Sequence, residues 1–214
     1  MTGIAARILV STVFLAPEAT LAREWNFEMA SPGRLPPHWT AAKTGQGAGS
    51  EWQVIPDPTA PTPGHVLAQT SSAGPMALFN LAVADDTLQQ DLDLSVKFKA
   101  VQGTNDQGGG LVWRYQDADN YYVARVNPLE DNFRVYKVEK GKRTQLQTAD
   151  VKVPAGEWHA LRVMHRGNDI QCFLDGKRYL AASDDTFHTS GKIGLWTKSD
   201  AVTWFDDLSL AAPQ

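Results

Sequence analysis

Two strand-like segments in the middle of the sequence carry arginines among apolar residues. The segment "GGGLVWRYQDADNYYVARVNP" spans residues 108–128 and contains Arg114 and Arg125, and "FRVYKVEK" follows it with Arg134. A guanidinium group presents its N–H donors in a planar fork that matches paired oxygen acceptors. These residues are therefore suited to bind the hydroxyl, carboxylate or phosphate groups of a ligand.

Alternation of side chains along a strand predicts which of these residues share a face. We take residues 117–120 as a four-residue turn, which pairs Gln116 with Tyr121. One face, which we expect in the core, then holds Leu111, Trp113, Tyr115, Tyr122, Ala124 and Val126, continued by Phe133 and Val135. The other face holds Val112, Arg114, Gln116, Tyr121, Val123 and Arg125, continued by Arg134 and Tyr136. This alignment places Arg125 opposite Arg134.

Two explanations account for arginines that face each other across a strand pair, an arrangement that costs a few tenths to about 1 kcal/mol. Loop carboxylates could pair with them, the candidates being Asp117, Asp119, Glu130 and Asp131. Alternatively, the face is a groove in which arginines contact a ligand and tyrosines offer flat rings and hydroxyls, which suits sugars. The second explanation gives a candidate binding set of Arg114, Arg125, Arg134, Tyr121 and Tyr136, with Asp119 and Asn120 at its rim.

The rest of the chain indicates the scaffold that must position these residues. Residues 31–64 are rich in Pro and Gly, which disfavours helices there. About a dozen short alternating runs follow, and Asp175-Gly176 between two of them is typical of a hairpin turn. We therefore expect an all-β fold, a two-sheet antiparallel β-sandwich of jelly-roll type, in a single domain over residues 24–212.

The net charge and the cysteine count exclude some classes of protein. The chain has 214 residues, a net charge of −4 and a pI of about 5.7, which argues against a nucleic-acid-binding protein. A single cysteine, Cys172, excludes an internal disulfide, and its apolar surroundings predict a core position.

The N-terminus has the features of a signal peptide. Arg7 precedes an apolar run over residues 8–16, and small residues at Thr20 and Ala22 fit a cleavage site. We expect removal of residues 1–22, export to the periplasm or the extracellular space, and no membrane span in the mature protein.

Metal ligands are less evident. No pair among the histidines has a metal-binding spacing. Asp206 and Asp207 lie on a strand near the C-terminus, where their carboxylates together with backbone carbonyls of an N-terminal strand could bind a structural calcium ion. The alternative is that they brace the edge of a sheet.

Several stretches resemble the concanavalin A-like lectin/glucanase superfamily. They are residues 108–128 and their continuation to "KGKRTQL", then "GEWHALRV", "FLDG", "GKIGLWTKSD" and "VTWFDDLSL". More narrowly, residues 24–212 resemble exported bacterial domains of the 3-keto-disaccharide hydrolase or laminin-G-like type. The resemblance implies a curved jelly roll whose concave sheet holds carbohydrate. It also implies adjacent terminal strands, where relatives bind calcium.

The sequence departs from the glucanases of this superfamily at the catalytic motif. No Glu-x-Asp-x-Glu strand is present, and "DLDLS" offers Asp91 and Asp93 without a glutamate. Retaining glycosidases need two carboxyl groups about 5 Å apart, a pair that one strand here does not supply. We therefore expect a carbohydrate-binding module. The alternatives are a hydrolase or lyase that acts on glycosides or 3-keto sugars in the same groove, and a structural or adhesive module.

Overall fold

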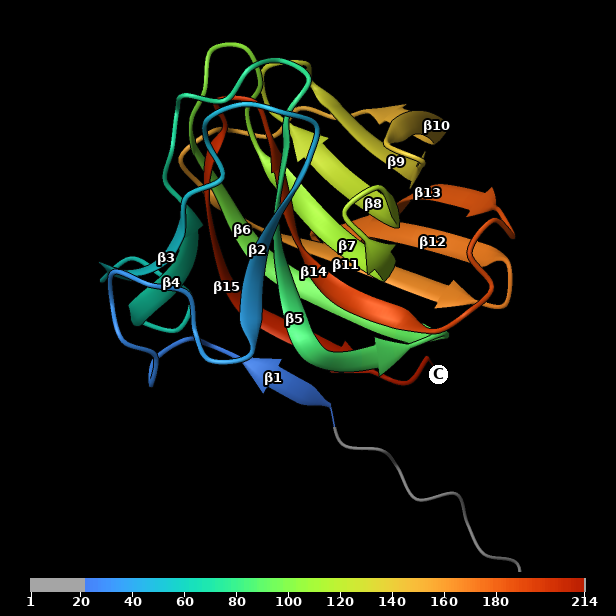
Figure 1. Cartoon of the computed structure of the whole chain (residues 1–214), viewed down its shortest axis with the longest axis horizontal. Coiled ribbons are helices and arrows are strands. Elements are labelled where there is room, and N and C mark those ends of the chain that lie inside the picture. The colour runs from blue at the N-terminus through green and yellow to red at the C-terminus, as the bar shows by residue number, and fades with distance from the viewer. Residues whose placement is uncertain (1–21, 214) are drawn as a thin grey trace, which may run out of the picture.

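The computed structural model describes residues 22–213. The predicted signal peptide therefore lies outside the described residues, apart from its last residue, Ala22. The described residues form two antiparallel sheets and no α-helix, as the alternation of the sequence predicts (Figure 1). It follows that none of their elements is a helix able to cross a membrane.

The first sheet, sheet 1, has eight strands. Their order across the sheet is β13 (Lys177–Ser183), β12 (Asp169–Leu174), β11 (Trp158–Arg166), β6 (Leu92–Gln102), β15 (Val202–Ala211), β4 (Gly64–Gln69) and β3 (Trp52–Asp57), and β1 (Arg23–Trp25) also pairs with β15. The pairing of β1 with β15 places the first and last strands side by side, near the C-terminus in Figure 1. The implied adjacency of the terminal strands is thus present.

The second sheet, sheet 2, has seven strands. Their order is β10 (Lys142–Asp150), β9 (Asn132–Glu139), β8 (Asn120–Asn127), β7 (Gly109–Asp117), β14 (Gly191–Lys198), β5 (Phe79–Gln89) and β2 (Trp39–Thr44). Strands β7, β8 and β9 are neighbours, and Arg125 pairs with Arg134 across β8 and β9. This register confirms the predicted opposition of the two arginines.

The inner faces of the two sheets form the core. Alternate residues of β6, from Leu92 to Phe98, point inward with those of β8, β11 and β14. Trp113 and Cys172 are both fully buried there, as the sequence predicts. Burial of apolar side chains contributes about 25 cal/mol per Å² removed from water, so this layer supplies most of the stability of the fold.

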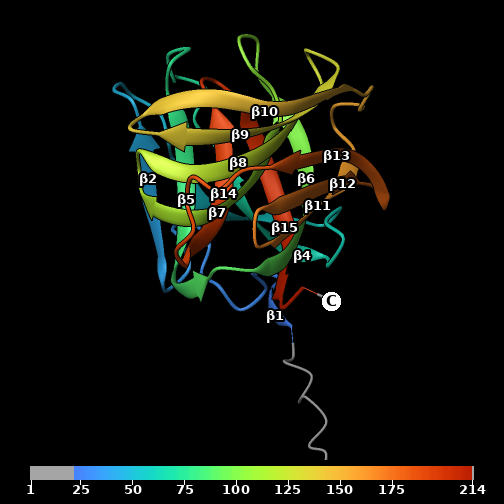
Figure 2. The same cartoon turned by 90° about the vertical axis from the view of Figure 1, so that its right-hand side faces the viewer.

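Sheet 2 also coils so strongly that part of its outer face is buried. In Figure 2, β2 and β5 run down the left side, whereas β9 and β10 cross the top. Thr44 at the end of β2 accepts a hydrogen bond from the Tyr121 hydroxyl of β8, 2.7 Å away, although three strands separate β2 from β8 in the sheet. A second apolar cluster fills the curl; its members are Phe79, Leu81, Val83, Val112, Tyr121, Val123, Tyr136, Val138 and Trp196.

The β7–β8 hairpin differs from the prediction at its tip. Asp117 pairs with Asn120, so the turn has two central residues, and the register shifts between Trp113 and Asp117. Arg114 adopts a φ of 45° at this irregularity. Residues 114–116 of β7 therefore oppose Tyr121 alone, and an irregularity of this kind redirects the side chains of the longer strand. Tyr115, predicted in the core, consequently packs against the outer cluster, with its ring centroid 6.0 Å from that of Tyr121.

Candidate functional site

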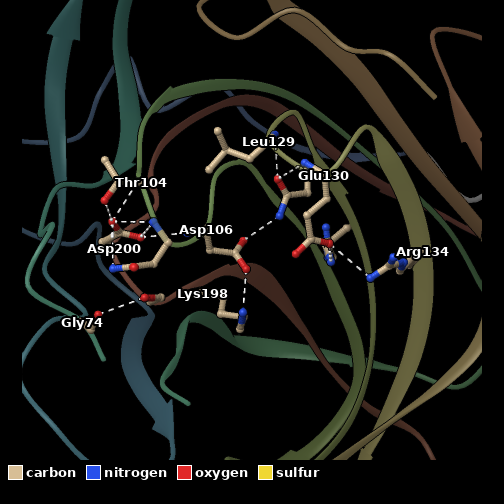
Figure 3. Close-up of polar contacts among 12 residues, drawn as sticks. Gly74, Thr104, Asp106, Leu129, Glu130, Arg134, Lys198 and Asp200 are labelled. Atoms are coloured by element: carbon tan, nitrogen blue, oxygen red, sulfur yellow. Dashed lines mark hydrogen bonds and ion pairs between the residues drawn. The ribbon is translucent and has the colours of Figure 1, made fainter. Parts of the chain in front are cut away.

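Polar side chains gather on the outer face of sheet 2 where β8 and β9 meet the 127–132 loop. Glu130 accepts hydrogen bonds from Arg125 at 2.9 Å and from Arg134 at 3.2 Å (Figure 3). Arg125 is only 1 % exposed and also donates to Asn132 at 2.9 Å. Glu130 therefore neutralises the repulsion between the two opposed arginines, which was the first of the two explanations considered above.

Tyr136 lies at the centre of three guanidinium groups. Its hydroxyl is 3.3 Å from an Arg125 nitrogen and 3.5 Å from an Arg134 nitrogen. The guanidinium of Arg143, on β10, lies over the ring of Tyr136 with its carbon 4.4 Å from the ring centroid. We call the set Arg125, Glu130, Arg134, Tyr136 and Arg143 the arginine surface.

Arg143 is held by aromatic rings instead of by a carboxylate. Its guanidinium carbon lies 5.0 Å from the centroid of Phe79 and 5.8 Å from that of Trp196, in addition to Tyr136. One of its terminal nitrogens is buried without a hydrogen-bond partner in the described part of the chain. Cation–π contacts of this kind contribute about 0.5–2 kcal/mol each. This nitrogen of Arg143 therefore has N–H donors without a protein acceptor, although it is itself enclosed.

A buried ion pair borders the arginine surface. Asp106 accepts hydrogen bonds from Lys198 at 2.7 Å and from Asn127 at 3.1 Å (Figure 3). Asp200 in turn accepts hydrogen bonds from the backbone N–H groups of residues 104–106, which shape the loop that carries Asp106. The loop is thus fixed by charge-assisted hydrogen bonds, which are stronger than neutral ones.

The ionisation of these groups follows from burial and from their partners. Burial opposes the charge of Glu130, but hydrogen bonds from Asn132 and Arg125 outweigh it and lower the Glu130 pKa to about 2. Burial raises the pKa of Asp106 despite its contact with Lys198, and burial lowers the pKa of Arg143. The carboxylates near Arg143 are those of Asp106 and Glu130, which form ion pairs with Lys198 and Arg125.

The structure separates the predicted binding residues into three places. Arg125, Arg134 and Tyr136 lie together on the arginine surface. Tyr121 is fully buried in the outer cluster, about 13 Å along β8 from Arg125 at 3.3 Å per residue. Asp119 and Asn120 accept hydrogen bonds from the backbone of residues 140–141, so they join two hairpin tips and do not form a rim around Arg125.

Arg114 was wrongly predicted to share this face. The bulge in β7 turns its side chain toward the turns at one end of the sandwich, where it is 1 % exposed. Its guanidinium donates to the carbonyl oxygens of Gln90 at 2.8 Å, Gly167 at 2.8 Å and Phe187 at 2.6 Å. Arg114 therefore ties together loops of both sheets and lies apart from the arginine surface.

Arg143 was missed because the pattern was followed only as far as Tyr136. The turn at residues 140–141 leads into β10, where Arg143 pairs with Val138. Val138 shares a face with Tyr136 two residues earlier, so alternation carried through one more hairpin places Arg143 beside Tyr136. The signal was present in "YKVEKGKR".

Asp206 and Asp207, the predicted calcium ligands, make hydrogen bonds within the protein. Both oxygens of Asp206 accept backbone N–H groups, from Thr62 at 2.9 Å and from Asp207 at 2.8 Å, and Asp207 accepts the Thr62 hydroxyl at 2.7 Å. Within residues 22–213, no group of three or more His, Cys, Asp or Glu side chains is arranged to hold a metal ion. Main-chain oxygens would have to supply most of a calcium site here, which stays a prediction.

The carboxylates considered for catalysis are held by cations. Asp93 forms an ion pair with Arg162, and Asp91 accepts the backbone N–H of Gly167 at 2.9 Å next to Arg114. A cavity of about 350 Å³ lies elsewhere, between β1 and β15, and one of about 220 Å³ lies on the outer face of sheet 1. Neither of these two cavities is lined by residues of the arginine surface.

Comparison with solved structures finds the same β-sandwich fold in several proteins. The carbohydrate-binding module CBM66 from Bacillus subtilis has 19 % sequence identity and a TM-score of 0.66, covering 82 % of this chain and 96 % of that one. A B. subtilis protein of unknown function with a galectin-like fold has 10 % identity and a TM-score of 0.54, covering 82 % and 90 %. A variant of the GH43 protein BlXynB from Bacillus licheniformis has 16 % identity and a TM-score of 0.51, covering 79 % and 38 %.

Sequence comparison gives a narrower result. No curated protein matches the chain. Residues 38–211, which span all the strands of the sandwich except β1, match the model of the 3-keto-alpha-glucoside-1,2-lyase-like domain. The concanavalin A-like resemblance of the sequence is consistent with both findings. The chain therefore belongs to the 3-keto-alpha-glucoside-1,2-lyase-like domain family.

Proposed function

We propose that this protein is a carbohydrate-binding module and that it holds its ligand at the arginine surface. The observation that carries the proposal is Arg143, whose guanidinium rests on three aromatic rings and retains donors without a protein partner. Sugar hydroxyls are acceptors that such donors can meet, and a hydrogen bond to a charged group contributes about 1.5–3 kcal/mol. The fold shared with the carbohydrate-binding module CBM66 supports the proposal.

The fixed geometry of the surface favours binding. Arg125 and Glu130 are held by Asn132, and Arg143 is held by aromatic rings, so these side chains lose little conformational freedom when a ligand arrives. Preorganisation of this kind improves affinity because the ordering cost is met during folding.

The experiment is retention of the protein on a panel of insoluble polysaccharides and on a glycan array, for wild type and Arg143→Ala. Arg162→Ala is the matched control, because Arg162 also lies over an aromatic ring, Phe173 at 5.3 Å, but on the outer face of sheet 1. We expect wild type and Arg162→Ala to be retained and Arg143→Ala to lose roughly tenfold or more in affinity. Equal retention of all three proteins, or no retention of any, would contradict the proposal.

The second candidate function is an enzyme that acts on 3-keto glycosides, and the family match favours it. Elimination from such a sugar needs a base, and Asp106 and Glu130 are the carboxylates of this region. Glu130 is held by Arg125 and its pKa is lowered, so it is a poor base. Asp106 is paired with Lys198, but burial raises its pKa, so it is the better candidate for the base. Recovery of the bound sugar unchanged after prolonged incubation supports binding, whereas its conversion to an unsaturated product supports the enzyme.

A further inference from the structure

We infer that the sugar recognised by the arginine surface is acidic, carrying a carboxylate or a sulfate group. This inference rests on the proposed function and specifies the class of ligand. It comes from the balance of charges on one patch of sheet 2 and from the contacts of Arg143.

Cations outnumber carboxylates on this patch. On the arginine surface, Arg125, Arg134 and Arg143 are set against Glu130 alone, an excess of two positive charges. The bordering cluster of Lys198, Asp106 and Asp200 has one cation and two carboxylates, which reduces the excess of the wider patch to one. The protein as a whole has a net charge of −4. The positive excess is therefore a local feature of this face and does not reflect a generally basic surface.

Arg143 differs from the other arginines that are not exposed. In residues 22–213 those are Arg114, Arg125, Arg134, Arg143 and Arg162, and all except Arg143 have a carboxylate oxygen within 4 Å. Removing a charge from water costs several kcal/mol, and an ion pair ordinarily offsets that cost. The aromatic rings under Arg143 offset part of it through cation–π attraction. An anionic group of a ligand would offset the rest of this cost by pairing with the Arg143 guanidinium.

The neighbouring carboxylates cannot pair with Arg143 without leaving another cation unpaired. Glu130 forms ion pairs with Arg125 and Arg134, and Asp106 forms one with Lys198, which is only 8 % exposed. A ligand carboxylate can instead reach Arg143 through the part of this side chain that is exposed, because Arg143 is only half-buried. The one enclosed guanidinium nitrogen is not available to it. Planar guanidinium–carboxylate pairing then supplies both strength and orientation.

The test compares acidic and neutral forms of the same sugar. Binding of the mature protein is measured by calorimetry to oligogalacturonate, to its fully methyl-esterified form and to a sulfated oligosaccharide. We expect the free acid or the sulfated sugar to bind roughly tenfold to a hundredfold more tightly than the ester, with a preference that weakens as salt increases. Equal affinity for the acid and the ester would overturn this inference while leaving the proposed function intact.

Variants separate charge recognition from structural effects. Arg143→Gln should bind the acid and the ester equally, Arg143→Lys should keep part of the preference, and the control Arg162→Gln should keep all of it. Melting temperatures identify any variant that fails to fold, and Arg143→Lys tests the inference should Arg143→Gln unfold. Retained discrimination in Arg143→Gln would overturn the inference. A protein that binds no sugar of any kind, neutral or acidic, would instead overturn the proposed function.

Discussion

Arg114 and Arg143 lie in the same sheet, yet their guanidinium groups meet different partners. Arg114 donates to three main-chain carbonyls and is fully enclosed, so its hydrogen bonds stabilise the fold. Arg143 rests on aromatic rings, and one of its terminal nitrogens has no hydrogen-bond acceptor in the protein. The residue type alone predicts that oxygen acceptors are nearby, and the environment decides whether those acceptors belong to the protein or to a ligand.

The first residue-scale prediction concerns Arg114. Arg114→Ala should lower the free energy of unfolding by about 3 kcal/mol, because the buried carbonyl of Phe187 and the partly buried carbonyls of Gln90 and Gly167 lose their donor. Urea denaturation measures the change, and Arg166→Ala, an exposed position nearby on β11, should stay within about 0.5 kcal/mol of wild type. A loss of sugar binding at unchanged stability in Arg114→Ala would contradict this assignment.

At the scale of elements, alternation predicted the strands well and their irregularities poorly. The faces of β8 and β9 follow strict alternation, so Arg125, Arg134 and Tyr136 were placed correctly. The bulge in β7 moved Arg114 and Tyr115, and no residue in "WRYQD" marks it. The contacts that Arg114 makes there are with turns far away in the sequence, which alternation within one strand does not report. Coiling of sheet 2 is likewise a long-range property that hydrophobic periodicity does not report.

The element-scale prediction concerns the closure of sheet 2 between β2 and β8. Thr44→Val should destabilise the protein by about 1–3 kcal/mol, because the Tyr121 hydroxyl is left buried without its partner. Hydrogen exchange should quicken in β2 more than in β14, which is paired on both sides. Thr40→Val is the control, because it removes a hydroxyl of the same strand that bonds Asp85 at an exposed position and does not contact β8. Unchanged hydrogen exchange in β2 would show that the Thr44–Tyr121 hydrogen bond does not hold β2 against β8.

At the scale of the whole molecule, the carboxylate of Asp206 couples stability to pH. Burial, together with the negative charges of Asp207 and Glu28, raises its pKa to about 6 despite hydrogen bonds from the Thr62 and Asp207 N–H groups. The folded protein therefore holds a proton here that the unfolded chain, with a pKa of 3.8, releases earlier. The stabilisation is complete below about pH 4 and is lost as the pH rises through 6.

We expect Asp206→Asn to gain stability relative to wild type as the pH rises from 4 to 7, by up to about 3 kcal/mol. Thermal melts across this pH range measure the difference, and an identical pH profile in both proteins would contradict it. Should the predicted calcium ion bind at Asp206 and Asp207, millimolar calcium will raise the melting temperature of wild type near pH 7 and leave that of Asp206→Asn unchanged.

The direction of β15 has a practical consequence. β1 pairs with residues 208–210 at the far end of β15, whereas Lys198 and Asp200 precede its first residue, Val202. Ten residues at about 3.3 Å each put roughly 30 Å between the two ends. A bead, chip or fused partner joined next to β1 or to the end of β15 would therefore lie at the end of β15 opposite Lys198 and Asp200. Immobilised protein can then be assayed with the proposed binding surface uncovered.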